Sequence, residues 1–574
     1  MKNIEIAQIF RDIAQILEIK GENPFRIRAY ERAAQNLESL SEDLEALAKA
    51  NRLREIPGIG ADLESKINEY LQKGSVSAYE DLKKSIPPAL LEILKVPEVG
   101  PKTAGLLFHE LKISGIADLE KKAKAGKLLG LPGIKEKTVD NILRGIALLK
   151  QGRERMNLAR ALYTAGEFTR ALERFPEVKM LSPAGSLRRR KETVRDIDIL
   201  VVSANPKMIM EHFVRLPQVK DILAHGETKS SILTQDGIQV DVRVVEEKSF
   251  GAALLYFTGS KNFNIRLRQM AIKKKLKINE YGIFSGKREK TTYVAGETEK
   301  DMFKALGMDY VEPELREDTG EIELALKHRL PQLIALKDVR GDLHCHSQWS
   351  DGSHSILELV QAAKKHGYQY IGITDHSQGL RVAHGLSISE LKKKKTEIEE
   401  INAKLKDFRV LYGTEVDIDS DGNLDYPEKV MAEFDVVVGA VHSGFKQSKE
   451  KLTRRLIKAC ENKNVHIIAH PTGILWGQRE AYELDFEMLF KACRDTGTAL
   501  EINSFYDRLD LNSTHARRAK ELGVKLCVNT DAHTTDQLSL MELGVAVARR
   551  GWLSAADVLN TLPLEKLLSA LGKR

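Results

Sequence analysis

Residues 342–351 read DLHCHSQWSD. If this segment is a strand, His344 and His346 point to the same face, because side chains alternate along a strand. Asp351 follows five residues after the second histidine. Imidazole and carboxylate groups gathered in this way are typical metal ligands. The segment therefore suggests one part of a metal site, whose remaining ligands must come from elsewhere in the chain.

Six further segments of the C-terminal half have the same form, a short apolar strand that ends in polar residues. They read YIGITDH, RVLYGTEVDI, FDVVVGAVHS, NVHIIAHPTG, TALEINS and VKLCVNTDAH, and helical patterns separate them. This alternation predicts a βα-repeat barrel, in which the loops at the carboxyl ends of the strands carry the functional residues.

The expected strand ends of this barrel supply nine candidate metal ligands. They are His344, His346, Asp351, His376, Glu415, His442, His470, Asp531 and His533. A single histidine is more often structural than a ligand, but six at equivalent positions beside three acids favour a metal centre. Nine ligands exceed the need of one ion, so we predict two or three. Nitrogen and oxygen donors without thiolate suit Mn²⁺, Zn²⁺ or Fe²⁺ rather than Mg²⁺ alone.

The region 156–310 predicts a second metal centre. In AGSLRRRKETVRDIDILVV (184–202), Asp196 and Asp198 lie two apart on an expected strand, and Asp241 lies on another, QVDVRVV (239–245). Three carboxylates can hold two Mg²⁺ ions for in-line nucleotidyl transfer. A lone D-x-D is common on solvated strands. The turn at Gly185 and Ser186, followed by three arginines that could bind phosphate, favours the catalytic interpretation.

Residues 1–155 predict short helices joined by Pro/Gly turns. The turns lie in IPGIGADLESKI (56–67), VPEVGPKTAGLL (96–107) and LPGIKEKTVDNIL (131–143). Such a turn before a helix exposes backbone N–H groups that can hold a DNA phosphate. The alternative is that these turns only join packed helices, but three copies favour DNA binding. The candidate contacts are Gly58, Gly60, Gly100 and Lys102.

The overall charge indicates little about partners, but its distribution does. The net charge is only +7, whereas residues 261–277 hold seven basic residues and no acid. This stretch predicts salt-sensitive contact with a DNA backbone. The run ELKKKKTEIEE (390–400) instead predicts a solvated helix face with pairs of opposite charge.

The four cysteines show no CxxC spacing, which is typical of reduced thiols in the cytoplasm. A secretory segment and a membrane-spanning run of about 18 apolar residues are both missing from the sequence. We therefore expect a soluble cytoplasmic protein associated with the nucleoid.

The motifs of residues 1 to about 310 resemble those of family X DNA polymerases. GSLRR, DID, VDVR and YFTGSKNFNIRLRQMAIKKKLKINEYGIF (256–284) carry the resemblance. It implies that Asp196, Asp198 and Asp241 bind catalytic Mg²⁺ or Mn²⁺. It also implies nucleotide contacts at Gly185, Ser186, Arg189, Tyr256, Phe257, Gly259 and Asn264, and DNA contacts at Arg268, Lys273, Lys274 and Lys275. Lys261 departs from the family pattern, because some relatives carry an acid there.

The same resemblance suggests a role for the first helical domain. Lys66 matches the Schiff-base lysine of the family's deoxyribose-phosphate lyases, and Tyr30 matches a position in that pocket. A Schiff base needs a neutral amine, so Lys66 would need a lowered pKa. The alternative is an ordinary lysine on a helix surface.

The C-terminal motifs resemble the PHP (polymerase and histidinol phosphatase) phosphoesterase domain, and all nine ligand positions are present. DLHCHSxxSDG, ITDH, GTEVDI, VHSG, AHPTG and TDAH carry this resemblance. It implies metal-assisted hydrolysis of a phosphodiester. Cys345, which lies between two ligands, is expected to face the barrel wall. The two resemblances together are those of bacterial or archaeal-type PolX.

We therefore predict a multidomain α and α/β chain. The expected parts are a helical 8-kDa-like domain (1–80), a helical fingers-like domain (81–155), a nucleotidyltransferase-type α+β palm (156–248), a thumb (249–312), a linker (313–340) and a distorted (βα)7-type PHP barrel (341–574).

The predicted function is gap filling on primer–template DNA with dNTPs, by a monomer with a 3′–5′ exonuclease in its PHP domain. Incision of abasic sites is left open. One alternative is a small-molecule phosphatase fused to a DNA-binding nucleotidyltransferase-like module. Another is a catalytically inactive DNA-binding scaffold, which the complete ligand sets disfavour.

Overall fold

The structure is a computed structural model, and the chain forms two compact units, Met1–Glu154 and Arg155–Arg574. Each is described by itself below. The described residues are 2–38, 40, 42, 44–87, 90, 93–94, 96, 99–136, 138–140, 142–143, 146, 155–286 and 292–572. No helix within these ranges is both long and apolar enough to cross a membrane.

All elements assigned among the described residues of the first unit are helical, as the sequence predicts. They are α1 (Lys2–Ile19), α2 (Pro24–Glu38), α3 (Leu44–Lys49), η1 (Leu53–Glu55), α4 (Ala61–Lys73), α5 (Ser77–Lys84), α7 (Pro101–Leu111) and α8 (Ile116–Lys124). The helices enclose two apolar clusters, one centred on α1, α2 and α4 and one on α7 and α8. Pro97 and Glu98 of the second turn, and Lys137 and Asn141 of the third, lie outside the described residues.

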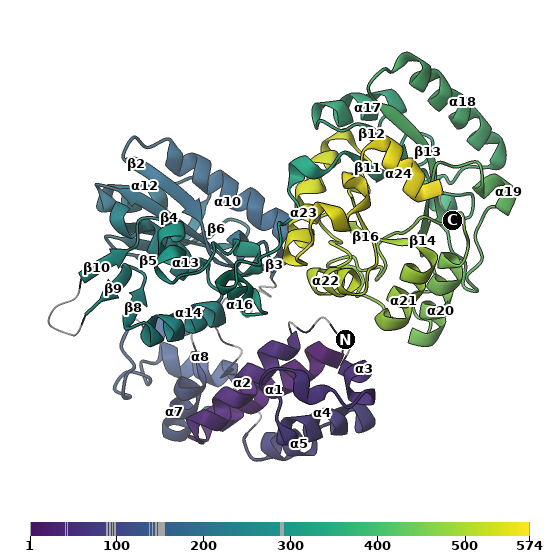
Figure 1. The fold of residues 1–574 in the computed structure, drawn as a ribbon. Helices are drawn as coiled ribbons and strands as arrows, with labels where there is room; N and C mark the ends of the chain where they lie inside the picture. Colours follow the sequence, from purple (N-terminus) through teal and green to yellow (C-terminus); the bar gives the residue numbers. More distant parts are fainter. Residues whose placement is uncertain are drawn as a thin grey trace. The chain divides into compact units, whose positions relative to one another are not determined.

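The second unit begins with a five-stranded mixed sheet of order β2-β4-β7-β6-β5 (Figure 1). Its strands are β2 (Val178–Pro183), β4 (Asp196–Ser203), β5 (Val219–His225), β6 (Lys229–Thr234) and β7 (Gln239–Val245). Helices α10 (Leu158–Glu173) and α12 (Pro206–Val214) pack against it, and their apolar residues share its core. The central strands β4 and β7 run parallel, with Asp198 opposite Asp241. The expected α+β palm is therefore present.

The thumb region follows the palm sheet. It contains α13 (Phe250–Thr258), α14 (Lys261–Lys273), α15 (Glu299–Ala305) and a small antiparallel sheet of β8 (Leu276–Asn279), β9 (Gly282–Ser285) and β10 (Thr292–Ala295). Buried Phe263, Leu267 and Phe303 join these elements into one cluster. The basic stretch 261–277 covers α14 and the start of β8.

The segment 313–340, which the sequence predicts to be a linker, is folded against the modules on either side. It contains η3 (Pro313–Leu315), α16 (Glu321–Leu326) and η4 (Leu336–Asp338), and Arg316 and Glu321 are fully buried. Arg316 Nη1 lies 2.5 Å from Glu299 Oε1, in the thumb. Glu317 lies 3.2 Å from Arg550 Nη1, at the end of α23 (Met541–Arg550) in the C-terminal barrel. The segment is polar because its charges pair across modules.

The C-terminal region is the expected barrel of parallel strands, in sequential order β11 to β17. The strands are β11 (Gly341–Cys345), β12 (Tyr370–Ile373), β13 (Arg409–Asp417), β14 (Val436–Ala440), β15 (Ile467–Ile468), β16 (Ala499–Asn503) and β17 (Leu526–Asn529). A parallel bridge between Cys345 and Ala532 brings the last strand back to the first. Cys345 is fully buried within the apolar core, which agrees with its expected place in the wall.

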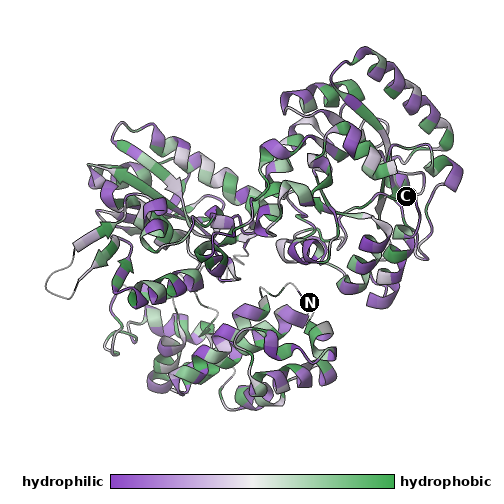
Figure 2. Ribbon diagram, in the orientation of Figure 1, coloured by the Kyte–Doolittle hydropathy of each residue, from purple (hydrophilic) through white to green (hydrophobic). Residues whose placement is uncertain are grey.

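Helices cover the outside of this barrel. They are α17 (Ile356–Lys365), α18 (Ile388–Lys404), α20 (Lys449–Cys460), α21 (Phe486–Thr496), α22 (Ser513–Glu521), α23 and α24 (Leu564–Gly572). Figure 2 shows mostly hydrophilic residues along α18 and mostly hydrophobic residues along the strand β13.

The prediction that 390–400 is a solvated helix face is wrong at one residue. Lys394 is fully buried, and its Nζ lies 2.8 Å from Asp375 Oδ2. The same Nζ donates to the carbonyl oxygens of Ile373 and Gly413. Lys394 thus ties α18 to the end of β12 and the middle of β13, beside the segment that carries His376.

We expect Lys394→Ala to destabilise the barrel by about 3–5 kcal/mol, because it leaves the buried Asp375 carboxylate without its cation. Lys395→Ala is the matched control, since Lys395 pairs with Glu433 at the surface. That loss should cost less than about 1 kcal/mol. Denaturant unfolding of both variants measures the difference, and equal midpoints would contradict it.

Candidate metal centres

The first centre lies at the end of the palm sheet, on two adjacent strands. Asp196 and Asp198 are half-buried on β4, whereas the alternate residues Ile197 and Ile199 are buried in the core. Asp241 lies opposite Asp198 on β7. The β4–β7 register therefore brings Asp241 next to Asp196 and Asp198, which the sequence places together on a different strand.

The carboxylates of this centre repel one another. Burial, and then the charges of Asp196 and Asp241, raise the pKa of Asp198 to about 7. Burial and Asp241 also raise the pKa of Asp196. Lys229 Nζ lies 3.5 Å from Asp241 Oδ2 and compensates part of this charge. A donor set of crowded oxygens with excess negative charge fits a hard divalent cation.

The turn before β4 packs directly against this carboxylate pair. Gly185 has φ +64°, and a Cβ there would lie 2.5 Å from Asp198 Oδ2, so the position requires glycine. Ser186 follows it in α11 (Gly185–Arg188). Arg189 Nε lies 3.1 Å from Glu317 Oε1, and its Nη1 donates to the carbonyl oxygen of Thr258.

The other two arginines of this turn, which the sequence offers as phosphate ligands, also pair with acids in the structure. Arg188 makes a bidentate pair with Glu299, at 2.8 and 2.6 Å. Arg190 Nη2 lies 2.8 Å from Glu542 on α23. Both side chains therefore join modules of the second unit, through acids that are distant in the sequence.

The predicted nucleotide and DNA contacts of the thumb lie along α13 and α14. Tyr256 is exposed. The guanidinium carbon of Arg243 lies 4.5 Å from the centroid of the Phe257 ring. Gly259, with φ +73°, ends α13, and Asn264 Nδ2 donates to the carbonyl oxygen of Tyr256 at 2.7 Å. Arg268, Lys273, Lys274 and Lys275 are exposed. The α14 surface thus presents several cations to solvent.

In the first unit, the predicted hairpin residues lie at helix starts. Gly60 and Gly100 are the N-caps of α4 and α7, Gly58 has φ +86°, and Lys102 is exposed in the first turn of α7. These positions leave the N–H groups of the first helical turns directed outward.

Lys66 lies on α4 and is partly buried. Its side chain is 13% exposed, pairs with Asp62, and places Nζ 6.0 Å from the centroid of the Tyr30 ring. The structure thus brings together the two residues that the lyase hypothesis needs. The lyase role itself stays a prediction.

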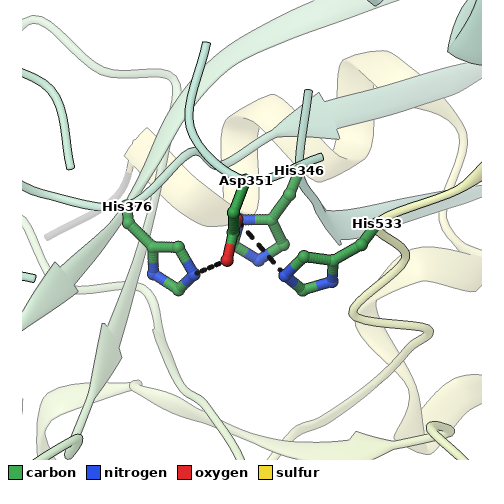
Figure 3. A group of neighbouring side chains, drawn as sticks. All are labelled: His346, Asp351, His376 and His533. Atoms are coloured by element: carbon green, nitrogen blue, oxygen red, sulfur yellow. Dashed lines mark ion pairs between the residues drawn. The ribbon is translucent and has the colours of Figure 1, made fainter. Parts of the chain in front are cut away.

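The second centre gathers all nine predicted barrel ligands at the strand ends. Three groups have ligand atoms within 4.8 Å of one another: His346, Asp351, His376 and His533; His344, His346 and Asp531; and His376, Glu415 and His442. Figure 3 shows the imidazoles of His346, His376 and His533 around Asp351. His470 Nε2 lies 3.0 Å from Glu415 Oε1 and adds the ninth residue. Shared members link the groups, so the centre is multinuclear in form.

The buried polar atoms of this centre fit metal ions. His344 Nε2, both ring nitrogens of His346 and Glu415 Oε2 are buried without a hydrogen-bond partner. Buried polar atoms are rarely unsatisfied, and several at one point indicate a missing ligand. Nitrogen and oxygen donors in this ratio suit Mn²⁺, Zn²⁺ or Fe²⁺.

The ionisable groups of the centre shift one another strongly. Burial acts to raise the pKa of Glu415, but His376, His442 and His344 hold that pKa well below its ordinary value. Burial acts to lower the pKa of His376, but Glu415 and Asp351 raise it to about 10. Burial and then His533 and His376 lower the pKa of His346 to about 4. Without metal, the centre therefore holds protons that bound cations would displace.

Family models match along most of the chain. They describe a helix-hairpin-helix domain at 1–76, a SAM-like helix-hairpin-helix tandem at 90–147, a DNA polymerase beta thumb at 253–317 and a PHP domain at 342–505. The "DNA polymerase/3'-5' exonuclease PolX" of Bacillus subtilis (strain 168) is 39% identical over 580 residues, which covers 100% of both chains. This chain belongs to the PolX family.

Two other relatives each match part of this PolX chain. DNA polymerase lambda of Rattus norvegicus is 25% identical over 344 residues, 55% of this chain and 56% of that protein. A probable phosphatase of Thermoanaerobacter sp. (strain X514) is 32% identical over 232 residues, 38% of this chain and 89% of that protein. The PHP region therefore resembles a separate, shorter protein as well as one part of a PolX chain.

Glu501 is a residue of the PHP centre that the sequence analysis missed. Its Oε1 lies 2.7 Å from His344 Nδ1, and its Oε2 accepts from the backbone N–H of His470. Asn503 and Asn529 also donate to it. Its signal was an acid inside the apolar strand TALEINS, where a buried charge needs a partner. Asp417 has a similar place, 3.2 Å from His442 Nδ1.

We expect Glu501→Gln to weaken metal binding at the PHP centre by about 10–100-fold, since the carboxylate orients His344 and increases its basicity. Titration of metal-free protein with Mn²⁺, followed calorimetrically, measures this. Glu487→Gln is the control, because Glu487 pairs with Arg518 at 2.8 Å on outer helices. An unchanged dissociation constant in Glu501→Gln would exclude this orienting role.

The palm centre predicts a pH-dependent stability in metal-free protein. The pKa of Asp198 is about 7 in the folded chain against an ordinary value of 3.8, so folding favours its protonated form. This contribution is complete below pH 3.8 and is lost as the pH rises towards 7.

At pH 8 in EDTA we therefore expect Asp198→Asn to stabilise the protein by about 2–4 kcal/mol, with the difference shrinking towards pH 4. Calorimetry across this pH range measures it, with the exposed Asp236→Asn as control. Equal stabilities at every pH would show that the carboxylates do not repel one another.

Proposed function

We propose that the chain is a DNA polymerase that fills short gaps during repair and removes 3′ nucleotides at its PHP centre. The observation that supports it best is that complete sets of ligands lie at both centres of one chain. PolX of B. subtilis, which is 39% identical along its whole length, is named for both activities. The substrates are then gapped or primer–template DNA and dNTPs.

At the palm centre, Asp196, Asp198 and Asp241 would hold two Mg²⁺ or Mn²⁺ ions. When bound, such ions activate the 3′ oxygen and neutralise charge on the triphosphate. Ser186 and Arg189 are proposed to bind the triphosphate, because both belong to the turn that packs on Asp198. Glu317 and the carbonyl of Thr258 orient the Arg189 guanidinium.

The remaining polymerase contacts are proposed from the thumb. Tyr256, Phe257 and Gly259 would face the incoming sugar, and Asn264 the edge of the base. Arg268 and Lys273–Lys275 would contact the DNA backbone. In the first unit, the turns at Gly58, Gly60, Gly100 and Lys102 would hold further phosphates.

At the PHP centre, the nine strand-end ligands would hold two or three Mn²⁺, Zn²⁺ or iron ions. When bound, these ions activate water and stabilise charge on the phosphodiester. Glu501 accepts the Nδ1 proton of His344, so the imidazole presents Nε2 to a metal. Asp417 orients His442 in the same way.

Each centre can be inactivated on its own. The double substitution of Asp196→Ala and Asp198→Ala removes two proposed metal ligands. It should reduce primer extension on a one-nucleotide gap by more than the roughly 100-fold expected when only a residue behind a ligand is changed. Primer degradation should stay intact. His344→Ala should abolish degradation and leave extension intact. A time course on a 5′-labelled primer with Mg²⁺ and Mn²⁺ measures both. Loss of both activities in either folded variant would contradict two separate sites.

The second candidate function is a small-molecule phosphatase, which the match to the probable phosphatase favours. The same assay distinguishes it. Turnover of a sugar phosphate by the PHP centre, with no shortening of the primer, would support the phosphatase and contradict the exonuclease.

A further inference from the structure

Two loops beside the PHP centre carry an arrangement that the proposed ligands do not explain. One loop follows β15 and contains His470 and residues 471–485. The other follows β16 and contains residues 504–512. Both leave the barrel at the strand ends where the metal ligands gather. Three of their residues, Arg479, Arg508 and Trp476, form the arrangement.

Arg508 lies directly against the metal centre. Its Nε is 3.5 Å from Asp531 Oδ2, and its side chain is only 16% exposed. The Nη1 atom is buried and has no hydrogen-bond partner. A buried guanidinium nitrogen with an unused donor beside a phosphodiesterase centre is suited to a substrate oxygen.

Arg479 brings a second positive charge to the same place. Its guanidinium lies 3.8 Å from the centroid of the Phe445 ring, and its Nε donates to the carbonyl oxygen of Gly473. Among the described residues, no carboxylate lies within ion-pair distance of Arg479. Arg479 and Leu475 exchange two backbone hydrogen bonds, at 2.8 and 2.9 Å, and the next residue, Trp476, is bonded to the loop of Arg508. Burial, and then the charge of Arg508, act to lower the pKa of Arg479, the direction expected for two neighbouring cations. An anion between such cations would relieve their repulsion.

The neighbouring acid only partly supplies that anion. Burial raises the pKa of Asp510 to about 7, and its Oδ2 accepts from the backbone N–H of Thr472. At neutral pH this carboxyl is therefore only partly ionised. Asp531 compensates a further charge through Arg508, so the two guanidinium groups together retain a fractional positive charge, which can attract a phosphodiester.

Trp476 adds an aromatic surface to the pair. Its indole Nε1 donates to the carbonyl oxygen of Arg508 at 3.1 Å, and its backbone N–H donates to the carbonyl oxygen of Asp507 at 2.7 Å. The ring is thus fixed to the loop that carries Arg508, yet the residue remains 40% exposed. A rigid, exposed indole next to paired guanidinium groups has the composition of sites that bind single-stranded nucleic acid.

We propose that Arg479, Arg508 and Trp476 form a subsite for the 3′-terminal segment of a single DNA strand. The guanidinium pair binds a phosphodiester, and one base stacks on the indole. A base inside a duplex is not the occupant, because neighbouring base pairs cover both of its faces, whereas an unpaired 3′ end leaves a base free to stack. A sugar phosphate would engage the arginines but would leave the indole unused. The inference rests on the proposed exonuclease and specifies how its substrate is held.

Intrinsic fluorescence tests the stacking without metals or turnover. The chain has three tryptophans. Trp552 is buried under Arg517, and Trp349 is partly buried with its indole bonded to Glu397. In EDTA, a single-stranded oligothymidylate should quench the wild type and leave Trp476→Phe unquenched. Quenching that persists in Trp476→Phe would overturn the proposal.

Kinetics with Mn²⁺ then test the effect on digestion. Trp476→Ala should raise KM for single-stranded DNA by about 5–100-fold, the effect of losing one base stack, with little change in kcat. Trp476→Phe should restore a low KM. Arg479→Gln should also raise KM, and Tyr163→Ala, which removes an exposed aromatic from the palm, should not.

A 3′-terminal abasic nucleotide provides the cross-check. Compared with an ordinary 3′ end, the abasic end should raise the KM of the wild type. It should not raise the KM of Trp476→Ala above the value that this variant has with an ordinary end. An unchanged KM in Trp476→Ala, with the wild type still digesting DNA, overturns the subsite alone. A wild type that digests no DNA overturns the proposed exonuclease and the subsite with it.

Discussion

The structure of the PHP region depends on one carboxylate. Glu415 is buried at the end of β13, and the imidazoles of His344, His346, His376, His442 and His470 all lie within 4.0 Å of its oxygens. One negative charge cannot satisfy five imidazoles, and the orphaned nitrogens around it show that it does not. The barrel brings these groups together because parallel strands end at one edge, and only cations can complete the arrangement.

The palm centre also holds ionisable groups close together without a metal. There the crowded groups are carboxylates, and burial, followed by the charges of Asp196 and Asp241, raises the pKa of Asp198. In both centres, the folded backbone holds charges in positions that are unfavourable without metal. This unfavourable arrangement of charges without metal is common to the two sites, although their folds and donors differ. It also explains why each site needs rigid support from residues behind it.

The sequence was sufficient to predict the barrel and the convergence of nine candidate ligands, because a strand-end position is readable from local pattern and parallel topology brings those ends together. It also placed Asp196 and Asp198 on one face of a strand. It could not predict that β4 and β7 are neighbours, since this pairing depends on tertiary packing. Glu501, Lys394 and the contacts of Glu317 were missed for the same reason. Each has partners far away in the sequence, and each looks like an ordinary charge in its own segment.

The central claim is that one chain holds two separate metal centres. Anomalous diffraction from crystals of the protein with Mn²⁺ and a non-hydrolysable dNTP tests it most directly. We expect two or three peaks among the nine PHP ligands, and separate peaks beside Asp196, Asp198 and Asp241. Absence of peaks from either position in a folded, nucleotide-bound crystal would contradict it.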